Sequence, residues 1–415
     1  MAARQTRRRN PPQLTSDRND SGPLLSQSRW DIFCSVVDNY GDVGVAWRLA
    51  RQLVSEHGIA ATLFVDDLRA LSRMVSGTAS GVDAKPDRRV IEGVQIRRWV
   101  GESDALLADY VADAVIETFG CGLPTLYVDA MARRARPPAW IVLEYLSAEA
   151  WIESHHGLPS PHPSLPLERY FFFPGFTPAT GGLLRERGLF ARRDEFQSNP
   201  AARTGFWDSL GIAEQAASAI VASLFCYPDA PLPSLFDAWA DGEDPVLCVV
   251  PEGVAAGALD RWTKGQVPSP GQALARGRLV VAAIPFLAQD DYDRLLWASD
   301  INFVRGEDSF VRAQWASRPL VWNTYAQSED AHALKQEAFL ARYDKGLAPD
   351  AAAAHASFSR SWNHAGDGGQ TIGALWPALI RAHPALQGHA HAWAQALATQ
   401  DDLAGALVKF VADRL

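Results

Sequence analysis

The sequence predicts an α/β protein made of two units, each a mostly parallel sheet flanked by helices. Short apolar runs of strand length alternate with stretches of helical periodicity in both halves of the chain. The 415 residues exceed one ordinary domain core, and 47% hydrophobic with 21% charged residues is usual for a globular chain. We therefore expect two domains that face one another across a cleft, because open sheets of this class bind ligands in such clefts.

Residues 1–29 precede the first predicted strand and are rich in arginine, proline and polar residues. The run Arg7, Arg8 and Arg9 raises the possibility of a twin-arginine export signal, but polar and proline residues follow where such a signal carries an apolar core. We therefore expect a disordered tail over 1–29 and a cytoplasmic protein. No run of about 18 apolar residues occurs, so neither a membrane-spanning helix nor a membrane partner is expected.

The charge balance and the cysteines argue against several classes of protein. The 39 basic and 48 acidic residues give a net charge of −9, which disfavours direct nucleic-acid binding because that needs a basic footprint. The four cysteines form no Cys-x-x-Cys pair, and the ten histidines show no His-Glu-x-x-His spacing. A disulfide scaffold and a zinc ribbon are therefore not expected.

The first half opens on the apolar run 30–37, which is a predicted strand. A polar turn follows at 38–44, then apolar residues at helical spacing over 45–54, then a strand at 61–65. Strand, turn, helix and strand in this order make one βαβ unit and predict a parallel sheet. The remaining strands of this half are expected at 114–117 and 139–143.

A second alternation of strands and helices begins near residue 217. Its helices include 291–298, and the last segment, 391–415, is also predicted to be helical. Between the two halves, the aromatic run 171–176 fits a binding loop and a packed surface loop equally well. The strands of the second half are expected at 218–226, 245–250, 278–284, 301–304 and 320–322.

The turn 305–309 joins a predicted strand to a predicted helix. Gly306 permits a sharp turn and a close approach to a ligand. Arg305, Ser309 and the free amides of the following helix can bind phosphate oxygens. Glu307 and Asp308 do not suit a plain phosphate site. They suit a cation, ribose hydroxyls or a cationic acceptor, or they offset the charge of a nearby arginine, or they stabilise the helix N-terminus.

The pattern Asp291–Tyr292–Asp293 matches the Asp-x-Asp motif of metal-dependent sugar transferases. We attribute these acids, with Asp290, to capping and to the first turn of an amphipathic helix, and expect no metal. Phe286 and Gln289 come just after the preceding strand, where a ring can stack on a base and an amide can read it. The alternative for Phe286 is a place in the core.

The first strand-to-helix turn, 38–44, carries Asp38 and Asp42. With glycine only at 41 and 44, it lacks the dinucleotide-binding Gly-x-Gly-x-x-Gly pattern, and its acids would repel a pyrophosphate. Two carboxylates at this place suit a general base or a cation clamp. The alternative is that Asp42 caps the helix and Asp38 forms the turn. A third turn, 117–124, follows another strand, and its glycines permit close packing.

Together, the motifs Asp-Asn-Tyr-Gly-Asp-Val-Gly at 38–44 and Arg-Gly-Glu-Asp-Ser at 305–309 resemble those of the EarP family, protein-arginine rhamnosyltransferases that modify bacterial elongation factor P. The resemblance runs from Trp30 to the C-terminus. It implies a GT-B fold, with two facing Rossmann-like domains and an interdomain cleft. It also implies dTDP-β-L-rhamnose as the donor substrate, inversion at the anomeric carbon, and neither a metal nor another cofactor.

The resemblance gives the expected domains and residue roles. An acceptor-side domain is expected at 30–216, a nucleotide-sugar-binding domain at 217–395, and a helix at 396–415 that packs back on the first domain; the tail 1–29 departs from the family pattern. Asp42 is the expected general base, with Asp38 and Glu307 as further catalytic carboxylates. Tyr227, Phe286 and Gln289 are expected at the thymine and deoxyribose, and Arg305, Ser309 and Tyr325 near the diphosphate. The remaining donor-binding residues are expected to be Asn39, Tyr40, Gly41, Gly306 and Asp308.

These acids suit an arginine acceptor. An arginine side chain stays protonated and is a poor nucleophile, so carboxylates in a partly desolvated cleft would orient the guanidinium and take a proton from it. Two alternatives stay open. One is a GT-B transferase with another nucleotide sugar or acceptor. The other is a nonenzymatic partner-binding protein on a GT-B scaffold.

Overall fold

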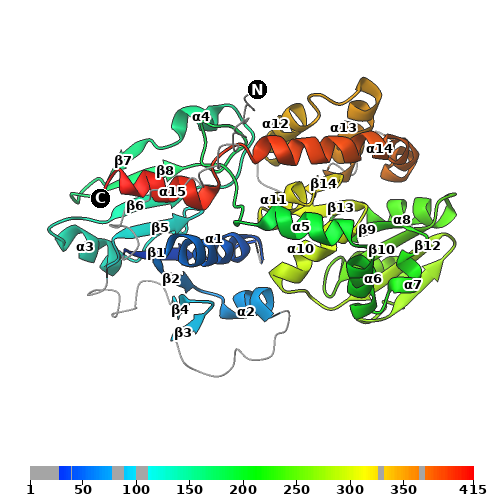
Figure 1. The fold of residues 1–415 in the computed structure, drawn as a ribbon, viewed down its shortest axis with the longest axis horizontal. Helices are drawn as coiled ribbons and strands as arrows, with labels where there is room; N and C mark the ends of the chain where they lie inside the picture. Colours follow the sequence, from blue (N-terminus) through cyan, green and yellow to red (C-terminus); the bar gives the residue numbers. More distant parts are fainter. Residues whose placement is uncertain (1–27, 39, 77–87, 100–110, 326–330, 364–369) are drawn as a thin grey trace, which may run out of the picture.

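The computed structural model describes residues 28–38, 40–76, 88–99, 111–325, 331–363 and 370–415. The described chain forms two α/β domains that stand side by side, each built on its own sheet (Figure 1). Residues 1–27 of the expected tail lie outside the described residues. The first strand, β1, begins at Arg29.

The sheet of the first domain has eight strands in the order β3-β4-β2-β1-β5-β6-β8-β7. Its two edge strands, β3 (Arg88–Ile91) and β7 (Pro159–Pro161), pair antiparallel with their neighbours. The strand order reverses between β1 and β5, which makes the carboxyl end of β1 a topological switch point. The parallel strands are β1 (Arg29–Cys34), β2 (Ala60–Val65), β4 (Val94–Arg98), β5 (Ala114–Thr118), β6 (Ala139–Leu143) and β8 (Glu168–Phe172).

The sheet of the second domain has six strands in the order β11-β12-β10-β9-β13-β14. Only its edge strand β11 (Ala273–Arg276) is antiparallel. Here the strand order reverses between β9 and β13, so the second switch point lies at the carboxyl end of β13. The parallel strands are β9 (Ile220–Leu224), β10 (Val246–Pro251), β12 (Leu279–Ile284), β13 (Ile301–Arg305) and β14 (Leu320–Asn323).

Helices cover both faces of each sheet. In the first domain, Ile32 and Cys34 of β1 share a core with α1 (Gly41–His57), whereas Phe33 faces the opposite layer and packs with α3 (Thr125–Arg133). Burial on both faces explains why the predicted strands read as continuous apolar runs. The other helices of this domain are α2 (Leu68–Ser76) and α4 (Trp151–His155). Those of the second domain are α8 (Leu232–Asp241), α9 (Ala256–Thr263), α10 (Gln289–Ala298), α11 (Asp308–Trp315), α12 (Ala331–Tyr343), α13 (Pro349–Asn363) and α14 (Ile372–Leu397).

The three helices α5 (Leu189–Ser198), α6 (Pro200–Ser209) and α7 (Ala213–Ala216) belong to the second domain by their packing. Phe206 and Trp207 of α6 share a core with Val221 of β9 and Leu295 of α10. The predicted boundary at 216 therefore differs from the packing, which assigns the chain from α5 onward to the second sheet. The reason is that amphipathic helices carry no local mark of the sheet that they cover.

The chain returns to the first domain at its C-terminal end (Figure 1). The segment 396–415 is not one helix: α14 ends at Leu397, and α15 spans Leu403–Ala412 after an N-cap by Asp402. Leu407 and Val411 of α15 lie in the same core as α1. The aromatic run 171–176 is also packed, since Phe172 and Phe176 are both buried in hydrophobic cores.

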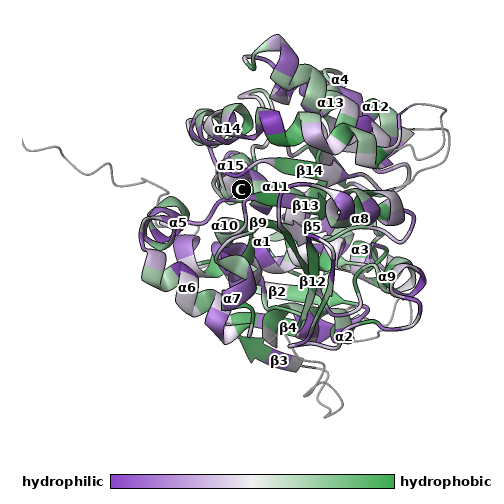
Figure 2. Cartoon of the chain, turned by 90° about the vertical axis from the view of Figure 1, so that its right-hand side faces the viewer, coloured by the Kyte–Doolittle hydropathy of each residue, from purple (hydrophilic) through white to green (hydrophobic). Residues whose placement is uncertain are grey.

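Hydrophobic residues concentrate in the strands, and hydrophilic residues mark the outer turns of helices such as α5 and α6 (Figure 2). Among the described residues, no helix combines the length and the apolar character needed to cross a membrane.

Candidate active site

The two turns singled out in the sequence meet at the interface of the domains. The turn after β1 carries Asp38 and Asp42, and the turn after β13 carries Arg305, Gly306 and Glu307. Each follows the strand at its domain's switch point, where an α/β sheet leaves room for a ligand. A hydrogen bond from Arg305 to Asp38 joins the two turns from opposite sides of the cleft.

Asp38 connects the two domains directly. Its Oδ1 accepts a hydrogen bond from Arg305 Nη1 at 3.1 Å, and its Oδ2 accepts one from the Tyr227 hydroxyl at 2.6 Å. Burial raises the pKa of Asp38, against the Tyr227 hydrogen bond and the Arg305 charge, which lower it. Burial and the Asp38 carboxylate raise the pKa of Tyr227, against Arg305, which lowers it, so the Tyr227 hydroxyl stays protonated and donates.

Asp42 is almost fully buried, with 1% of its surface exposed. Its Oδ2 accepts hydrogen bonds from the backbone amides of Val37 at 2.9 Å and Asp38 at 2.8 Å, while its Oδ1 has no hydrogen-bond partner among the described residues. Burial raises its pKa despite these amides. The N-cap of α1 is Tyr40, so Asp42 is not the capping residue; it lies inside the first turn. A buried carboxyl with one unbound oxygen is available for proton transfer.

Glu307 is the third acid at this place. Its carboxylate accepts a hydrogen bond from the Leu146 amide at 2.7 Å, which ties the second domain to the chain just after β6. Burial raises the pKa of Glu307 to about 7; Lys335 and the amide lower it, and the negative charges of Asp42 and Asp38 raise it further. The acids are therefore close enough to disfavour one another's ionisation.

A pocket of about 520 Å³ opens beside the acids. At one part of its wall the ring of Tyr40 packs on the ring of Phe286, with centroids 4.6 Å apart, and Arg73 lies 5.1 Å from the Phe286 centroid. The predicted donor-binding residues that line it are Tyr40, Gly41, Phe286, Gln289, Arg305, Gly306, Asp308 and Ser309, together with Asp38.

Arg305 is the cation of the pocket. Its guanidinium lies 4.5 Å from the ring centroid of Tyr227 and 4.7 Å from that of Phe225. Its Nε is buried without a hydrogen-bond partner among the described residues. Such a donor is costly to leave unpaired, so it marks a place where a ligand oxygen can bind.

Gly306 and Ser309 shape the turn around Arg305. Gly306 has φ of +60°, and a Cβ there would lie 2.7 Å from Asp38 Oδ2, so only glycine lets the turn approach Asp38 this closely. Ser309 Oγ donates to the Arg305 carbonyl and accepts from the Arg305 amide at 3.2 Å. Its hydroxyl therefore closes the turn in this structure.

Asp308 and Gln289 lie at the inner end of the pocket, in contact with α1. Arg48 Nε donates to Asp308 Oδ1 at 2.7 Å, and Gln289 Nε2 donates to Asp308 Oδ2 at 3.2 Å. Gln289 also donates to the Gly44 carbonyl at 3.1 Å, which leaves its Oε1 buried and without a partner among the described residues. That oxygen can accept a hydrogen bond from a ligand.

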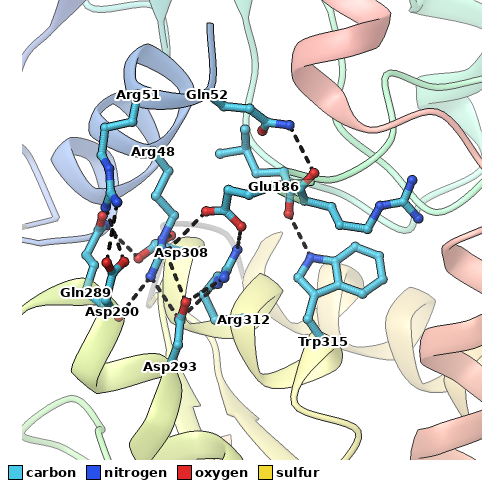
Figure 3. Close-up of polar contacts among 12 residues, drawn as sticks. Arg48, Arg51, Gln52, Glu186, Gln289, Asp290, Asp293, Asp308, Arg312 and Trp315 are labelled. Carbon is cyan, nitrogen blue, oxygen red and sulfur yellow. Dashed lines mark hydrogen bonds and ion pairs between the residues drawn. The ribbon is translucent and has the colours of Figure 1, made fainter. Parts of the chain in front are cut away.

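Arg48 is the centre of a buried ion cluster between the domains (Figure 3). Besides Asp308, it binds Asp293 Oδ1 at 3.0 Å, and Arg312 binds both Asp293 and Glu186. The prediction that Asp293 serves the first turn of its helix is therefore wrong, because its carboxylate is buried between two arginines. The N-cap of α10 is Ala288, without a side-chain cap; Asp290 and Asp291 lie in the first turn.

The remaining predicted residues lie at the edge of the site or outside the described chain. Tyr325 is 46% exposed, and its ring meets that of Tyr227 edge-on with centroids 5.5 Å apart. Asn39 lies outside the described residues. Among the residues that the structure does describe, no three His, Cys, Asp or Glu side chains are placed to share a metal ion.

Several residues of the site were missed in the sequence. Tyr145 lies two residues after the end of β6, and its ring stacks on Phe119 with centroids 4.4 Å apart, close to the three acids. Phe225 and Tyr292 line the pocket. For Tyr145 and Phe225, a position just after a strand was a usable signal in the sequence. Nothing local marks Arg48, which lies in the middle of a helix.

Comparison with known proteins agrees with the architecture. The model of the family described as the elongation factor P (EF-P) rhamnosyltransferase EarP matches residues 30–412. A protein-arginine rhamnosyltransferase of Pseudomonas putida is 49% identical over 389 residues, covering 94% of this chain and 100% of that protein. One from Pseudomonas aeruginosa is 46% identical over 386 residues, covering 93% and 99%.

A solved structure described as the structural basis for EarP-mediated arginine glycosylation of translation elongation factor EF-P is also similar. It is 38% identical, with a TM-score of 0.66, and the match covers 94% of this chain and 100% of that one. The predicted two-domain GT-B fold is confirmed by this likeness and by the two facing sheets. The chain belongs to the EarP family of EF-P rhamnosyltransferases.

Proposed function

We propose that this protein is an inverting glycosyltransferase that moves L-rhamnose from dTDP-β-L-rhamnose to an arginine side chain of EF-P. The observation that carries the proposal is the grouping of Asp38, Asp42 and Glu307 beside a pocket that also presents Arg305. A cationic acceptor needs the acids, and an anionic donor needs the arginine. The names of the relatives supply the sugar and the amino acid that is modified.

The donor's parts correspond to the chemistry of the pocket. The Tyr40 and Phe286 rings offer an apolar surface to the base, and the unpartnered Oε1 of Gln289 can accept from the N3–H of thymine. The unpartnered Nε of Arg305 and the N-terminus of α11 can receive the diphosphate. Tyr325, at the rim, is proposed to contact the diphosphate as the domains close on it.

Transfer proceeds as a single displacement in this proposal. A nitrogen of the arginine side chain bonds to the anomeric carbon as the bond from that carbon to the diphosphate oxygen breaks. The electron pair of the broken bond leaves with thymidine diphosphate, and the proton on the nitrogen passes to Asp42. Attack from the face opposite the leaving group inverts the anomeric carbon. Asp38 and Glu307 hold the guanidinium in line.

The departing diphosphate needs positive charge in the transition state. Arg305 and the amides at the start of α11 supply it from a preorganised position, so we propose that no metal ion is required. The acceptor, a translation factor, implies that the reaction occurs in the cytoplasm. All four cysteines are unpaired, which accords with a reducing compartment.

The test is the intact mass of EF-P from the same organism after incubation with this protein, dTDP-β-L-rhamnose and EDTA. A gain of one deoxyhexose on an arginine supports donor, acceptor and metal independence together. A parallel reaction with UDP-glucose tests the choice of donor, and one with added magnesium tests whether a metal ion contributes. Thymidine diphosphate binding without transfer would contradict the acceptor assignment. Neither transfer nor nucleotide binding would favour a nonenzymatic partner-binding protein.

A further inference from the structure

Tyr145 presents an aromatic surface at the carboxyl edge of the first sheet, next to the catalytic acids. One side of its ring is stacked on Phe119, at 4.4 Å between centroids and 16° between planes. The amide of the next residue, Leu146, donates to Glu307, so the backbone holds Tyr145 against the turn after β13. Two neighbouring elements thus hold the Tyr145 ring in place beside the acids.

The ammonium group of Lys335, on α12, lies over this ring, with its Nζ 5.3 Å from the Tyr145 centroid. Its charge lowers the pKa of the Glu307 and Glu144 carboxyl groups, against the effect of burial, which raises both. Lys335 is part-buried and makes no ion pair within 4.0 Å among the described residues. The Lys335 ammonium therefore lies over an aromatic ring and near acidic groups, but without a close ion-pair partner among the described residues.

We propose that Tyr145 and Glu307 form the subsite for the acceptor guanidinium, and that the Lys335 ammonium occupies this subsite until the acceptor displaces it. The inference rests on the proposed function and assigns to it residues for acceptor recognition. A planar guanidinium stacks on an aromatic face better than an ammonium does and can donate to two carboxylates at once. The acceptor therefore has an advantage over the lysine that it replaces.

The place of the subsite agrees with the chemistry of transfer. Charges of Asp42, Glu307 and Asp38 all raise the pKa of the Tyr145 hydroxyl, in addition to burial, so the ring lies close to all three acids. A guanidinium on this ring is thus next to the unpartnered Oδ1 of Asp42. Residues of both domains form this subsite, and the donor pocket adjoins it because Asp38 lines that pocket.

The test is steady-state kinetics with EF-P as the varied substrate. Tyr145→Leu removes the aromatic face and is expected to raise the KM for EF-P about tenfold while leaving the Kd of thymidine diphosphate unchanged. Tyr145→Phe keeps the ring and is expected to raise the KM less than Tyr145→Leu does. Lys335→Met removes the competing cation at nearly constant volume and is expected to lower the KM about threefold to tenfold.

Lys345→Met is the matched control, because Lys345 is exposed beyond the end of α12. Nucleotide binding by each variant reports that it is folded. A wild-type KM in Tyr145→Leu, or a raised KM in Lys335→Met, would overturn the inference while leaving the proposed function intact. Failure of the wild-type protein to modify EF-P would overturn the proposed function itself, and the inference with it.

Discussion

Asp42 shows at the scale of one residue how a short motif makes a reactive group. One carboxylate oxygen is bound by two backbone amides of its own turn, and the other is buried and unbound. The amides hold the side chain in place, and burial raises its pKa, which brings it nearer to that of a base that works at neutral pH. The turn bends back on itself, so Asp42 can reach the amide of Asp38, four residues earlier in the sequence. The short motif is therefore sufficient to form this geometry.

The variant Asp42→Asn tests the proposed general base. The asparagine Oδ1 can still accept from the amides of Val37 and Asp38, so the turn is expected to keep its shape. We expect the transfer rate to fall by about 10²- to 10⁴-fold, the usual size of a general-base contribution, with little change in nucleotide affinity. Single-turnover kinetics and nucleotide titration measure the two effects. Unchanged turnover would show that another group accepts the proton.

Glu307 makes the stability of the fold depend on pH. Its pKa is raised from 4.5 to about 7, so the native state binds more protons than the unfolded state between these values. Stability is therefore expected to fall as the pH rises through this window. In Glu307→Gln, whose amide oxygen can still accept from Leu146, the fall is expected to be smaller. Thermal unfolding of both proteins across the window measures the difference; parallel Tm curves would contradict it. The pKa of Asp31 is also raised to about 7. Because Asp31 is present in both proteins, its contribution cancels in the comparison of their stabilities.

Two turns, each between a strand and a helix, carry most of the site at the scale of elements. The sequence correctly predicted that these turns follow β1 and β13, because strands and helix N-termini are recognised from local patterns. The Asp-x-Asp pattern of α10 shows the limit of such local reasoning. Asp291 does lie in the first turn of the helix, as predicted. Asp293 instead faces inward and pairs with two arginines, one from α1 and one from α11.

Gly306→Ala tests the turn after β13. The new Cβ would meet Asp38 Oδ2 at 2.7 Å and would also strain a backbone with φ of +60°. Gly211→Ala is the matched control, since its φ is +73° and its Cβ would meet nothing within 4 Å. Both are expected to lose about 1–2 kcal/mol of stability from backbone strain, but only Gly306→Ala is expected to weaken nucleotide binding. Equal nucleotide affinities would contradict the role of the Gly306–Asp38 approach.

The ion cluster around Arg48 holds the two domains together at the scale of the whole molecule. Arg48 comes from the first domain, and its partners Asp308 and Asp293 come from the second (Figure 3). Both arginines of the cluster have 1% of their side-chain surface exposed. The cluster holds three carboxylates against two guanidinium groups, and Arg312 and Arg48 keep the pKa of Glu186 well below its usual range although burial alone would raise it.

Arg48→Met tests this cluster. It leaves Asp308 and part of Asp293 buried without a cation, and we expect a loss of about 3–5 kcal/mol in the free energy of unfolding. Arg51→Met, one turn along the same helix, breaks partly exposed ion pairs and is expected to cost about 1 kcal/mol or less. Urea unfolding compares them. Adding Asp308→Asn to Arg48→Met should recover part of the loss. Equal effects of the two arginine variants would contradict a special role for the cluster.

The sequence by itself determined the alternation of strands and helices, the two charged turns and their places after strands, and, through its motifs, the family. These properties depend on neighbours along the chain. Only the tertiary structure decided which charges meet: Arg48 and Asp308 are 260 positions apart, and Lys335 reaches Tyr145 from another domain. It also assigned α5–α7 to the second sheet. The physical reason is that ion pairs, buried acids and helix packing depend on how two separately folded sheets come together, and no local pattern encodes that.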